Sequence, residues 1–169
     1  SGGFKEIMRA GVECLGDMTE YNLYEVVALA ALSLQTISCS SVLIVSHLGI
    51  LAALLEEIRP GEQRQQLLRC LGEKNQQGVQ QAAAAAGASR ETAELLTAMA
   101  TACGRPEELL PRLMEQSPSP AITRALEQLQ QVLGQVSAVS RVPVLLDLSL
   151  TGDMNYYNGL IFGGYVQGV

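Results

Sequence analysis

The chain has 169 residues, of which 48% are hydrophobic and 17% are charged. This length fits one domain, or a domain with a small satellite, and the composition excludes an intrinsically disordered chain, which would be polar and rich in charge. The formal net charge is -6, so a broad basic surface for a nucleic-acid backbone is not expected. The longest apolar run, at residues 26–34, is far shorter than the roughly 20 residues that a membrane-spanning helix needs. We therefore expect neither a nucleic-acid partner nor a membrane location.

The cysteines and the single histidine limit the metal and redox chemistry that is open to the chain. Cys14, Cys39, Cys70 and Cys103 are too far apart in sequence for a CxxC metal-binding knuckle. His47 is the sole histidine, which excludes a site built from several histidines. Spaced cysteines and an N-terminus without a charged-then-apolar signal fit the reducing cytoplasm. The sequence thus predicts a cytoplasmic protein with no metal and no cofactor.

The first 58 residues alternate between strand and helix patterns. Thr19 precedes an acidic start and an apolar body, a pattern typical of a helix N-terminus. Four apolar residues follow Ser40-Ser41, and three of them are β-branched, so this short run favours a buried strand. We expect a strand over residues 4–16, a helix over 20–36, a strand over 42–45 and a helix over 47–58.

Residues 62–135 change in character. They are rich in Ala, Gln, Leu and Glu and poor in β-branched residues, as a helical bundle would be. Ser89 begins one helix pattern, and residues 121–139 predict a long helix. The low-complexity run from Gln80 to Ala86 is interpreted as a small-residue helix, packed closely on a neighbour or exposed, because alanine brings no recognition chemistry.

The strand pattern returns near the C-terminal end of the sequence. Residues 142–148 predict a buried strand with Pro143 at its edge, Gly152-Asp153 a turn, and residues 156–166 a further strand. This order of strands and helices predicts an α+β fold with a helical insertion. The expected division is an antiparallel-sheet body from residues 1–58 and 141–169, with a helical insertion at 59–140.

Motifs for catalysis are scarce in this sequence. His47 is available for a Ser-His-acid triad, but the chain has no G-x-S-x-G elbow. A phosphate-binding loop of the Walker A or G-x-G-x-x-G type is also missing, and the stretch from Gly159 to Gly164 lies in a strand pattern, where glycines mark bulges or close backbone approach. For His47, at a strand end, a helix-capping or core role is favoured over a ligand role.

Two carboxylates and two tyrosines remain as candidate functional residues. Glu13 and Asp147 stand in apolar strand patterns, where a carboxylate is costly unless it meets a cation or hydrogen-bond donors. Each is alternatively a strand residue that faces outward. Tyr156 and Tyr157 are either core rings or phenol donors that line a pocket, and the residue pattern by itself favours the core.

Two segments together resemble the catalytic domain of histidyl-tRNA synthetases. Residues 4–16 read Phe-Lys-Glu-Ile-Met-Arg-Ala-Gly-Val-Glu-Cys-Leu-Gly and are similar to the second half of class II motif 2. Residues 152–162 read Gly-Asp-Met-Asn-Tyr-Tyr-Asn-Gly-Leu-Ile-Phe and are similar to the family's histidine-binding strand with its paired tyrosines. The resemblance covers nearly the whole chain. It implies a class II aminoacyl-tRNA synthetase-like antiparallel sheet with flanking helices and an all-helical insertion.

Three positions depart from the synthetase pattern. Lys5 stands where the synthetase has an ATP-binding arginine, Arg9 where it has a substrate-binding glutamine, and Gly152 where it has a catalytic arginine. Without the cations that hold the ATP phosphates and the reacting carboxylate, the electrostatic stabilisation that adenylate formation needs is lost. Such losses resemble the synthetase paralogue that serves as the regulatory subunit of ATP phosphoribosyltransferase in bacterial histidine biosynthesis.

This resemblance implies a non-catalytic subunit that assembles with the catalytic ATP phosphoribosyltransferase subunit and takes part in feedback by histidine on the first step of histidine biosynthesis. Such allostery requires histidine to bind one assembly state better than another. One alternative is a divergent histidyl-tRNA synthetase that activates histidine with ATP and charges tRNA. Another is a synthetase-like module that binds tRNA within a larger regulatory protein. Motif 1, the start of motif 2 and the Gly-Gly-Gly-Arg motif are missing, so we expect a longer protein. Because motif 1 is the dimer element of the family, we expect the full-length protein to form a homodimer.

The resemblance also implies a histidine-like pocket formed by Glu13, Arg9, Tyr156 and Tyr157. Glu13 would receive the α-amino group of the ligand, Tyr157 would place its phenol beside the imidazole, and Tyr156 would wall the site. Arg9 replaces a neutral amide, so a pair between Arg9 and Glu13 would compete with the ligand amine. Gly152 removes a cation, so binding would be weak and insensitive to ATP.

Overall fold

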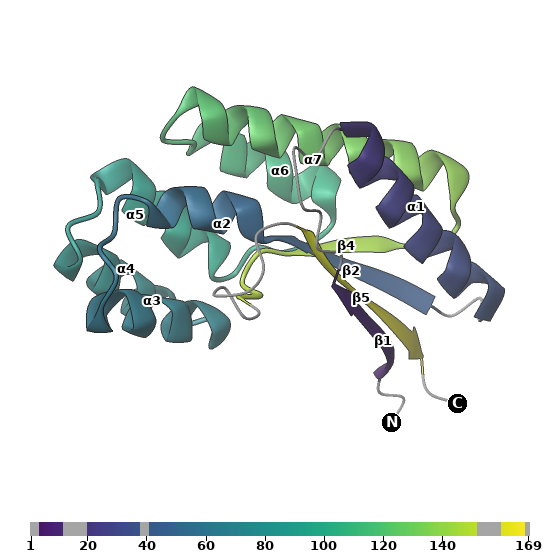
Figure 1. Ribbon diagram of the computed structural model, residues 1–169, viewed down its shortest axis with the longest axis horizontal. Coiled ribbons are helices and arrows are strands. Elements are labelled where there is room, and N and C mark those ends of the chain that lie inside the picture. The colour runs from purple at the N-terminus through teal and green to yellow at the C-terminus, as the bar shows by residue number, and fades with distance from the viewer. Residues whose placement is uncertain (1–3, 12–19, 38–40, 152–159, 168–169) are drawn as a thin grey trace.

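The computed structural model describes residues 4–11, 20–37, 41–151 and 160–167 (Figure 1). Within these ranges the strands form one five-stranded sheet, in the spatial order β1-β5-β2-β4-β3. Neighbouring strands are antiparallel except for β2 and β4, which run parallel. The strands are β1 (Phe4–Gly11), β2 (Ser41–His47), β3 (Cys103–Gly104), β4 (Val144–Asp147) and β5 (Leu160–Gln167).

One group of helices covers a face of this sheet. In Figure 1 the helices α1 (Glu20–Ile37), α6 (Pro106–Glu115) and α7 (Pro120–Val139) lie on the same side of the strands. Helix α1 contacts α7, β2 and β5, and α6 contacts α7 and β4. The apolar residues of α1 and α7 recur at the three- and four-residue spacing of one helix face, which explains why these helices bury a continuous stripe. The buried stripes are Val27, Ala31 and Leu34 on α1 and Leu126, Leu129, Leu133 and Val136 on α7.

A second group of helices extends from one end of the sheet (Figure 1). It contains α2 (Leu48–Leu55), α3 (Glu62–Gly72), α4 (Gln76–Ala85) and α5 (Arg90–Met99). Helix α4 contacts α3 and α5, and α5 also contacts α2. The low-complexity segment lies mostly in α4, where Ala82 and Ala83 are buried. This confirms the interpretation of a small-residue helix that packs closely on its neighbours.

Several predicted boundaries differ from the structure in informative ways. The predicted helix over 20–36 agrees with α1. The strand predicted over 142–148 is shorter, because after β4 the chain turns and the Leu148 backbone N–H donates to the Ala102 carbonyl at 3.1 Å. Residues 12–16 of the first predicted strand and 156–159 of the last lie outside the described residues.

The segment 59–140 contains one strand that the sequence analysis did not predict. Strand β3 pairs with β4 through Cys103 opposite Asp147. It is two residues long, too short for any hydrophobic alternation to reveal it. In this segment, helix α7 packs on α1, and helix α6 packs on α7, β3 and β4. The division into a body and a helical insertion remains a prediction.

Candidate functional site

The ends of four strands meet at one edge of the sheet. Strands β1 and β2 both run antiparallel to β5, and β4 runs parallel to β2, so the C-terminal ends of β1, β2 and β4 lie beside the N-terminal end of β5. Ile161 shows this alignment, because it lies opposite both Gly11 and Ser46. We call this region the site edge. It consists of Gly11, Ser46, His47, Asp147 and Leu160.

The residues predicted to form the histidine-like pocket are placed only in part. Arg9 lies in β1 opposite Gly163 of the neighbouring strand, two residues before Gly11 at the site edge. Glu13, Tyr156 and Tyr157 lie outside the described residues. The pocket therefore stays a prediction, with the backbone of one member placed near the site edge.

His47 is the last residue of β2 and the N-cap residue of helix α2. Its Nδ1 accepts a hydrogen bond from the Ile50 backbone N–H at 3.1 Å, which satisfies one of the free donors of the first helical turn. Burial lowers the pKa of His47 to about 4. The ring is therefore neutral at pH 7, and because Nδ1 is the acceptor, the proton lies on Nε2. This geometry confirms the predicted helix-capping role.

Ser46, the residue before His47, is a buried serine. Its exposed fraction is 1%, and its Oγ has no hydrogen-bond partner in the described part of the chain. A buried hydroxyl left in this state costs about 1–3 kcal/mol, so such groups are uncommon in folded proteins. No sequence signal distinguishes Ser46, because a serine in an apolar strand looks the same whether or not it is paired.

Asp147, at the end of β4, is held by a cation and by hydroxyl and amide donors. Lys74 Nζ lies 3.1 Å from each of its carboxylate oxygens. Ser149 donates to Oδ1 from its backbone N–H at 3.0 Å and from its Oγ at 2.6 Å. The prediction that this carboxylate needs a cation or donors is confirmed. Lys74 was not predicted, because a partner 73 positions away leaves no local pattern. Ser149, two residues after Asp147, was not predicted either.

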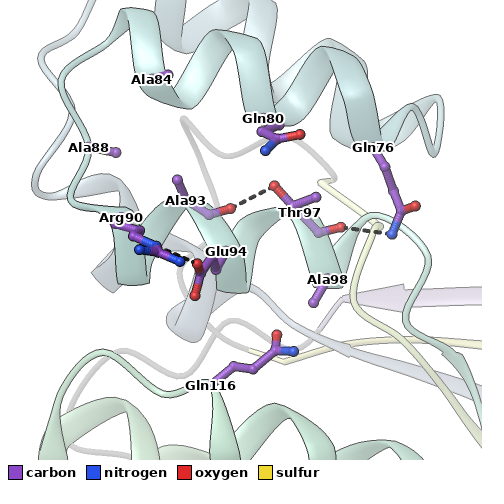
Figure 2. A pocket seen from close by; sticks show the side chains of 10 residues that line it. All are labelled: Gln76, Gln80, Ala84, Ala88, Arg90, Ala93, Glu94, Thr97, Ala98 and Gln116. Atoms are coloured by element: carbon purple, nitrogen blue, oxygen red, sulfur yellow. Dashed lines mark hydrogen bonds and ion pairs between the residues drawn. The ribbon is translucent and has the colours of Figure 1, made fainter.

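A hollow of about 740 Å³ lies away from the site edge, along α4 and α5 (Figure 2). Figure 2 shows Gln76 and Gln80 above helix α5 and Gln116 below it. Gln76 donates to the Thr101 hydroxyl at 2.9 Å, and Arg90 forms an ion pair with Glu94 at 2.8 Å. Amides, alanines and one exposed ion pair provide neither a nucleophile nor an acid–base pair, so this hollow has no catalytic chemistry. Its lining residues are Gln76, Gln80, Ala84, Ala88, Arg90, Ala93, Glu94, Thr97, Ala98 and Gln116.

The described ranges contain neither a metal-binding cluster nor a membrane-spanning helix. Among these residues no three His, Cys, Asp or Glu side chains lie close enough to hold a metal ion. None of the helices described here is long and apolar enough to cross a lipid bilayer. Cys70 and Cys103 are free thiols.

The whole sequence matches one protein family. The family model for histidyl-tRNA synthetase covers residues 1–169. The chain belongs to the histidyl-tRNA synthetase family. The resemblance found from motif 2 and the paired tyrosines is thereby confirmed at the level of the family.

The curated relatives within this histidyl-tRNA synthetase family carry the name of a regulatory protein. The ATP phosphoribosyltransferase regulatory subunit of Caldanaerobacter subterraneus subsp. tengcongensis is 27% identical over 99% of this chain and 45% of its own length. That of Methylobacillus flagellatus is 30% identical over 97% of this chain and 42% of its own length. The chain spans about half the length of the curated relatives it matches. The resemblance to these regulatory subunits is confirmed.

Solved structures of histidyl-tRNA synthetase type share the fold. A chain from Bacillus halodurans C, described as an ATP phosphoribosyltransferase regulatory subunit/histidyl-tRNA synthetase, is 29% identical with a TM-score of 0.66 over 89% of this chain and 40% of its own. The histidyl-tRNA synthetase of Nostoc sp. PCC 7120 has a TM-score of 0.63 at 13% identity over 89% of this chain and 37% of its own. The second likeness concerns the fold alone. Together they confirm the class II synthetase-like fold.

Proposed function

We propose that this chain is the synthetase-like part of a non-catalytic regulatory subunit of ATP phosphoribosyltransferase. The observation that carries the proposal is the shared name of the curated relatives, which match 95–99% of this chain. The departures from the synthetase pattern support it independently. By the resemblance, Lys5 and Arg9 replace an ATP-binding arginine and a substrate-binding glutamine, and Gly152 replaces a catalytic arginine. A cation that would stabilise adenylate formation is therefore missing at position 152.

The proposed partner is the catalytic ATP phosphoribosyltransferase subunit, and the proposed signal is histidine. Feedback follows if histidine binds one assembly state more tightly than the other, because a ligand shifts an equilibrium by its differential affinity. The proposal includes a homodimer at full length and a cytoplasmic location. The free thiols of Cys70 and Cys103 support the location, because unpaired cysteines are typical of reducing compartments.

The proposed ligand site is the histidine-like pocket of Glu13, Arg9, Tyr156 and Tyr157. Two facts support it. Arg9 lies two residues before the end of β1 at the site edge, and the tyrosines precede β5, which begins at Leu160 on the same edge. Glu13 would accept the ligand's ammonium in a charge-assisted hydrogen bond.

The first experiment separates the regulatory subunit from a divergent synthetase. Purified full-length protein is assayed for histidine-dependent exchange between ATP and pyrophosphate, and for binding to the purified catalytic subunit by light scattering. We expect no exchange and a stable mixed complex. Exchange that depends on histidine, together with no mixed complex, would instead identify an active synthetase.

The second experiment tests the pocket. Calorimetric titration of the full-length protein with histidine is repeated for Glu13→Gln and Tyr157→Phe, with Glu94→Gln and Tyr24→Phe as matched controls outside the proposed pocket. Loss of a hydrogen bond to a charged group weakens binding about ten- to hundredfold, so both pocket variants should bind more weakly than the controls. If all four variants bind as wild type does, histidine binds elsewhere, and the pocket proposal is wrong.

A further inference from the structure

Lys74 adopts a backbone conformation that normally belongs to glycine. Its φ is +58°, and it is the one non-glycine residue with positive φ in the described ranges. It follows helix α3 in a Schellman turn, in which the Asn75 N–H donates to the Cys70 carbonyl at 2.9 Å and the Lys74 N–H to the Leu71 carbonyl at 3.0 Å. At this position a side chain crowds the following carbonyl, so glycine is favoured. A lysine here calls for an explanation from its side chain.

The side chain of Lys74 reaches the end of β4. Its ammonium contacts both carboxylate oxygens of Asp147 at 3.1 Å and the Ser149 hydroxyl at 2.6 Å. The Asp147 side chain is 12% exposed and that of Lys74 is 46% exposed. The lysine thus brings a partly solvated cation to a mostly buried carboxylate. A buried carboxylate that loses its cation is strongly disfavoured, which gives this contact more weight than a surface ion pair has.

The same contact joins two parts of the fold that are distant in sequence. The other ion pairs between described residues, at Arg90 and Arg105, connect positions at most four apart. Lys74 and Asp147 are 73 positions apart. A Cβ placed on Gly72 would lie 3.8 Å from the Thr151 hydroxyl, so the end of α3 also approaches the chain that follows β4.

We propose that Lys74 is a positioning residue that fixes the turn between α3 and α4 against the Asp147–Ser149 turn at the site edge. Asp147 is part of this edge, next to the end of β2, so the position of the helices α3 and α4 is coupled to the strands that carry the ligand site. Because the ligand is the histidine of the preceding section, this part of the inference rests on the proposed function. The contact of Lys74 with Asp147 and Ser149 does not depend on the proposed function.

The test uses three Lys74 variants of the full-length protein that separate the backbone from the side chain. Lys74→Gly relieves the left-handed strain and removes the ammonium, Lys74→Met keeps the strain and removes the ammonium, and Lys74→Arg keeps a cation. Arg69→Met is the matched control, because Arg69 is an exposed cation of the preceding helix α3 that bonds to Gln66 one turn away. The readouts are the hydrogen-exchange rates of the Leu148 and Ser149 amides and the affinity for histidine.

We expect Lys74→Gly and Lys74→Met both to speed exchange at Leu148 and Ser149, because the turn loses the contact that holds it closed. Both should also weaken histidine binding, by at most about tenfold, because the effect is indirect and cannot exceed the lost charged hydrogen bond. Lys74→Arg and Arg69→Met should stay close to wild type. A turn that merely needs a left-handed residue predicts the opposite for Lys74→Gly, with unchanged or slower exchange. That result overturns the proposal, and so does faster exchange with unchanged histidine affinity.

The two readouts also separate this inference from the proposed function. If wild-type protein does not bind histidine, the proposed pocket fails, while faster amide exchange in Lys74→Gly and Lys74→Met still supports the fixing contact. If wild-type protein binds histidine and neither variant changes amide exchange, the proposed function stands and the role of Lys74 is wrong.

Discussion

Three buried polar side chains at the site edge differ in how they are compensated. His47 stays neutral and caps a helix. Asp147 stays paired with Lys74 and with Ser149. The hydroxyl of Ser46 is buried and has no hydrogen-bond partner among the residues that the structure describes. Since an unpaired or uncompensated polar group is expensive in a low-dielectric interior, these residues make the site edge sensitive to single substitutions.

The pH dependence follows from His47. Burial lowers its pKa to about 4 in the folded protein, against about 6.5 in the unfolded chain. Between these values the unfolded state binds the proton and the folded state does not, so stability falls as the pH drops from about 6.5 toward 4. At pH 5 the loss should reach about 2 kcal/mol relative to pH 7.

His47→Asn removes this titration while keeping a helix cap, because asparagine also accepts from the first-turn amides. Urea denaturation of wild type and variant at pH 7 and pH 5 measures the difference. We expect the variant to lose less stability on acidification. Equal losses in both proteins would mean that His47 does not contribute.

Two glycines in helices should respond in opposite directions to alanine. An added Cβ on Gly134 in α7 would meet no atom within 4 Å in the described residues, apart from its chain neighbours and the backbone of its own helix. Gly134→Ala should therefore stabilise the protein by up to about 1 kcal/mol. At Gly78 in α4 the added Cβ would lie 2.6 Å from Cys70 Sγ and 2.7 Å from Asn75 Nδ2. Overpacking of this kind costs about 1–3 kcal/mol, so Gly78→Ala should destabilise it. Thermal unfolding of both variants checks the signs, and a stabilising Gly78→Ala would show that α3 and α4 can move apart.

At the scale of elements, the N-terminus of α5 links the loop after α2 to the helical group. Ser89 caps the helix by accepting from the Thr92 N–H at 3.2 Å. Glu57 accepts from the Ser89 N–H at 3.1 Å and from the Thr92 hydroxyl at 2.9 Å. The Ser89 backbone hydrogen bond is the main reason that the pKa of Glu57 is lowered. A carboxylate at this end also interacts favourably with the helix dipole.

We expect Ser89→Ala to destabilise the protein by about 1 kcal/mol, the usual cost of a lost N-cap. Ser137→Ala, at an exposed position in α7, is the matched control. Because folding lowers the pKa of Glu57, the ionised carboxylate stabilises the folded protein above the ordinary pKa range of glutamate, and this stabilisation is lost as the pH falls through the lowered pKa. Denaturant unfolding at pH 7 measures the free energy that the Ser89 cap contributes. A Ser89→Ala variant as stable as the Ser137→Ala control would contradict the capping role.

The elements that the sequence predicted well are those set by local chemistry. Helix α1 has an acidic start and a long apolar body, Ser89 offers a side-chain acceptor at a helix start, and the alanines of α4 have high helix propensity. Strand β3 was missed because Cys103 and Gly104 become a strand solely by pairing with β4. Long-range pairing of this kind leaves no periodic pattern in two residues.

At the scale of the whole molecule, the same limit applies to the candidate site. The need of Asp147 for a partner was predictable from its apolar neighbours, but its partner Lys74 comes from a turn between two helices that looks ordinary in sequence. Family resemblance, rather than local pattern, indicates Glu13, Arg9, Tyr156 and Tyr157. Of these the structure describes the backbone of Arg9, and the other three lie outside the described residues.

The full-length protein is proposed to regulate a separate catalytic subunit. The most direct measurement is the rate of pyrophosphate release by the purified catalytic ATP phosphoribosyltransferase subunit, with and without the full-length protein, over a range of histidine concentrations. We predict that the protein raises the rate and that histidine lowers the rate of the mixed complex. A rate that does not depend on the added protein at any histidine concentration would contradict the claim.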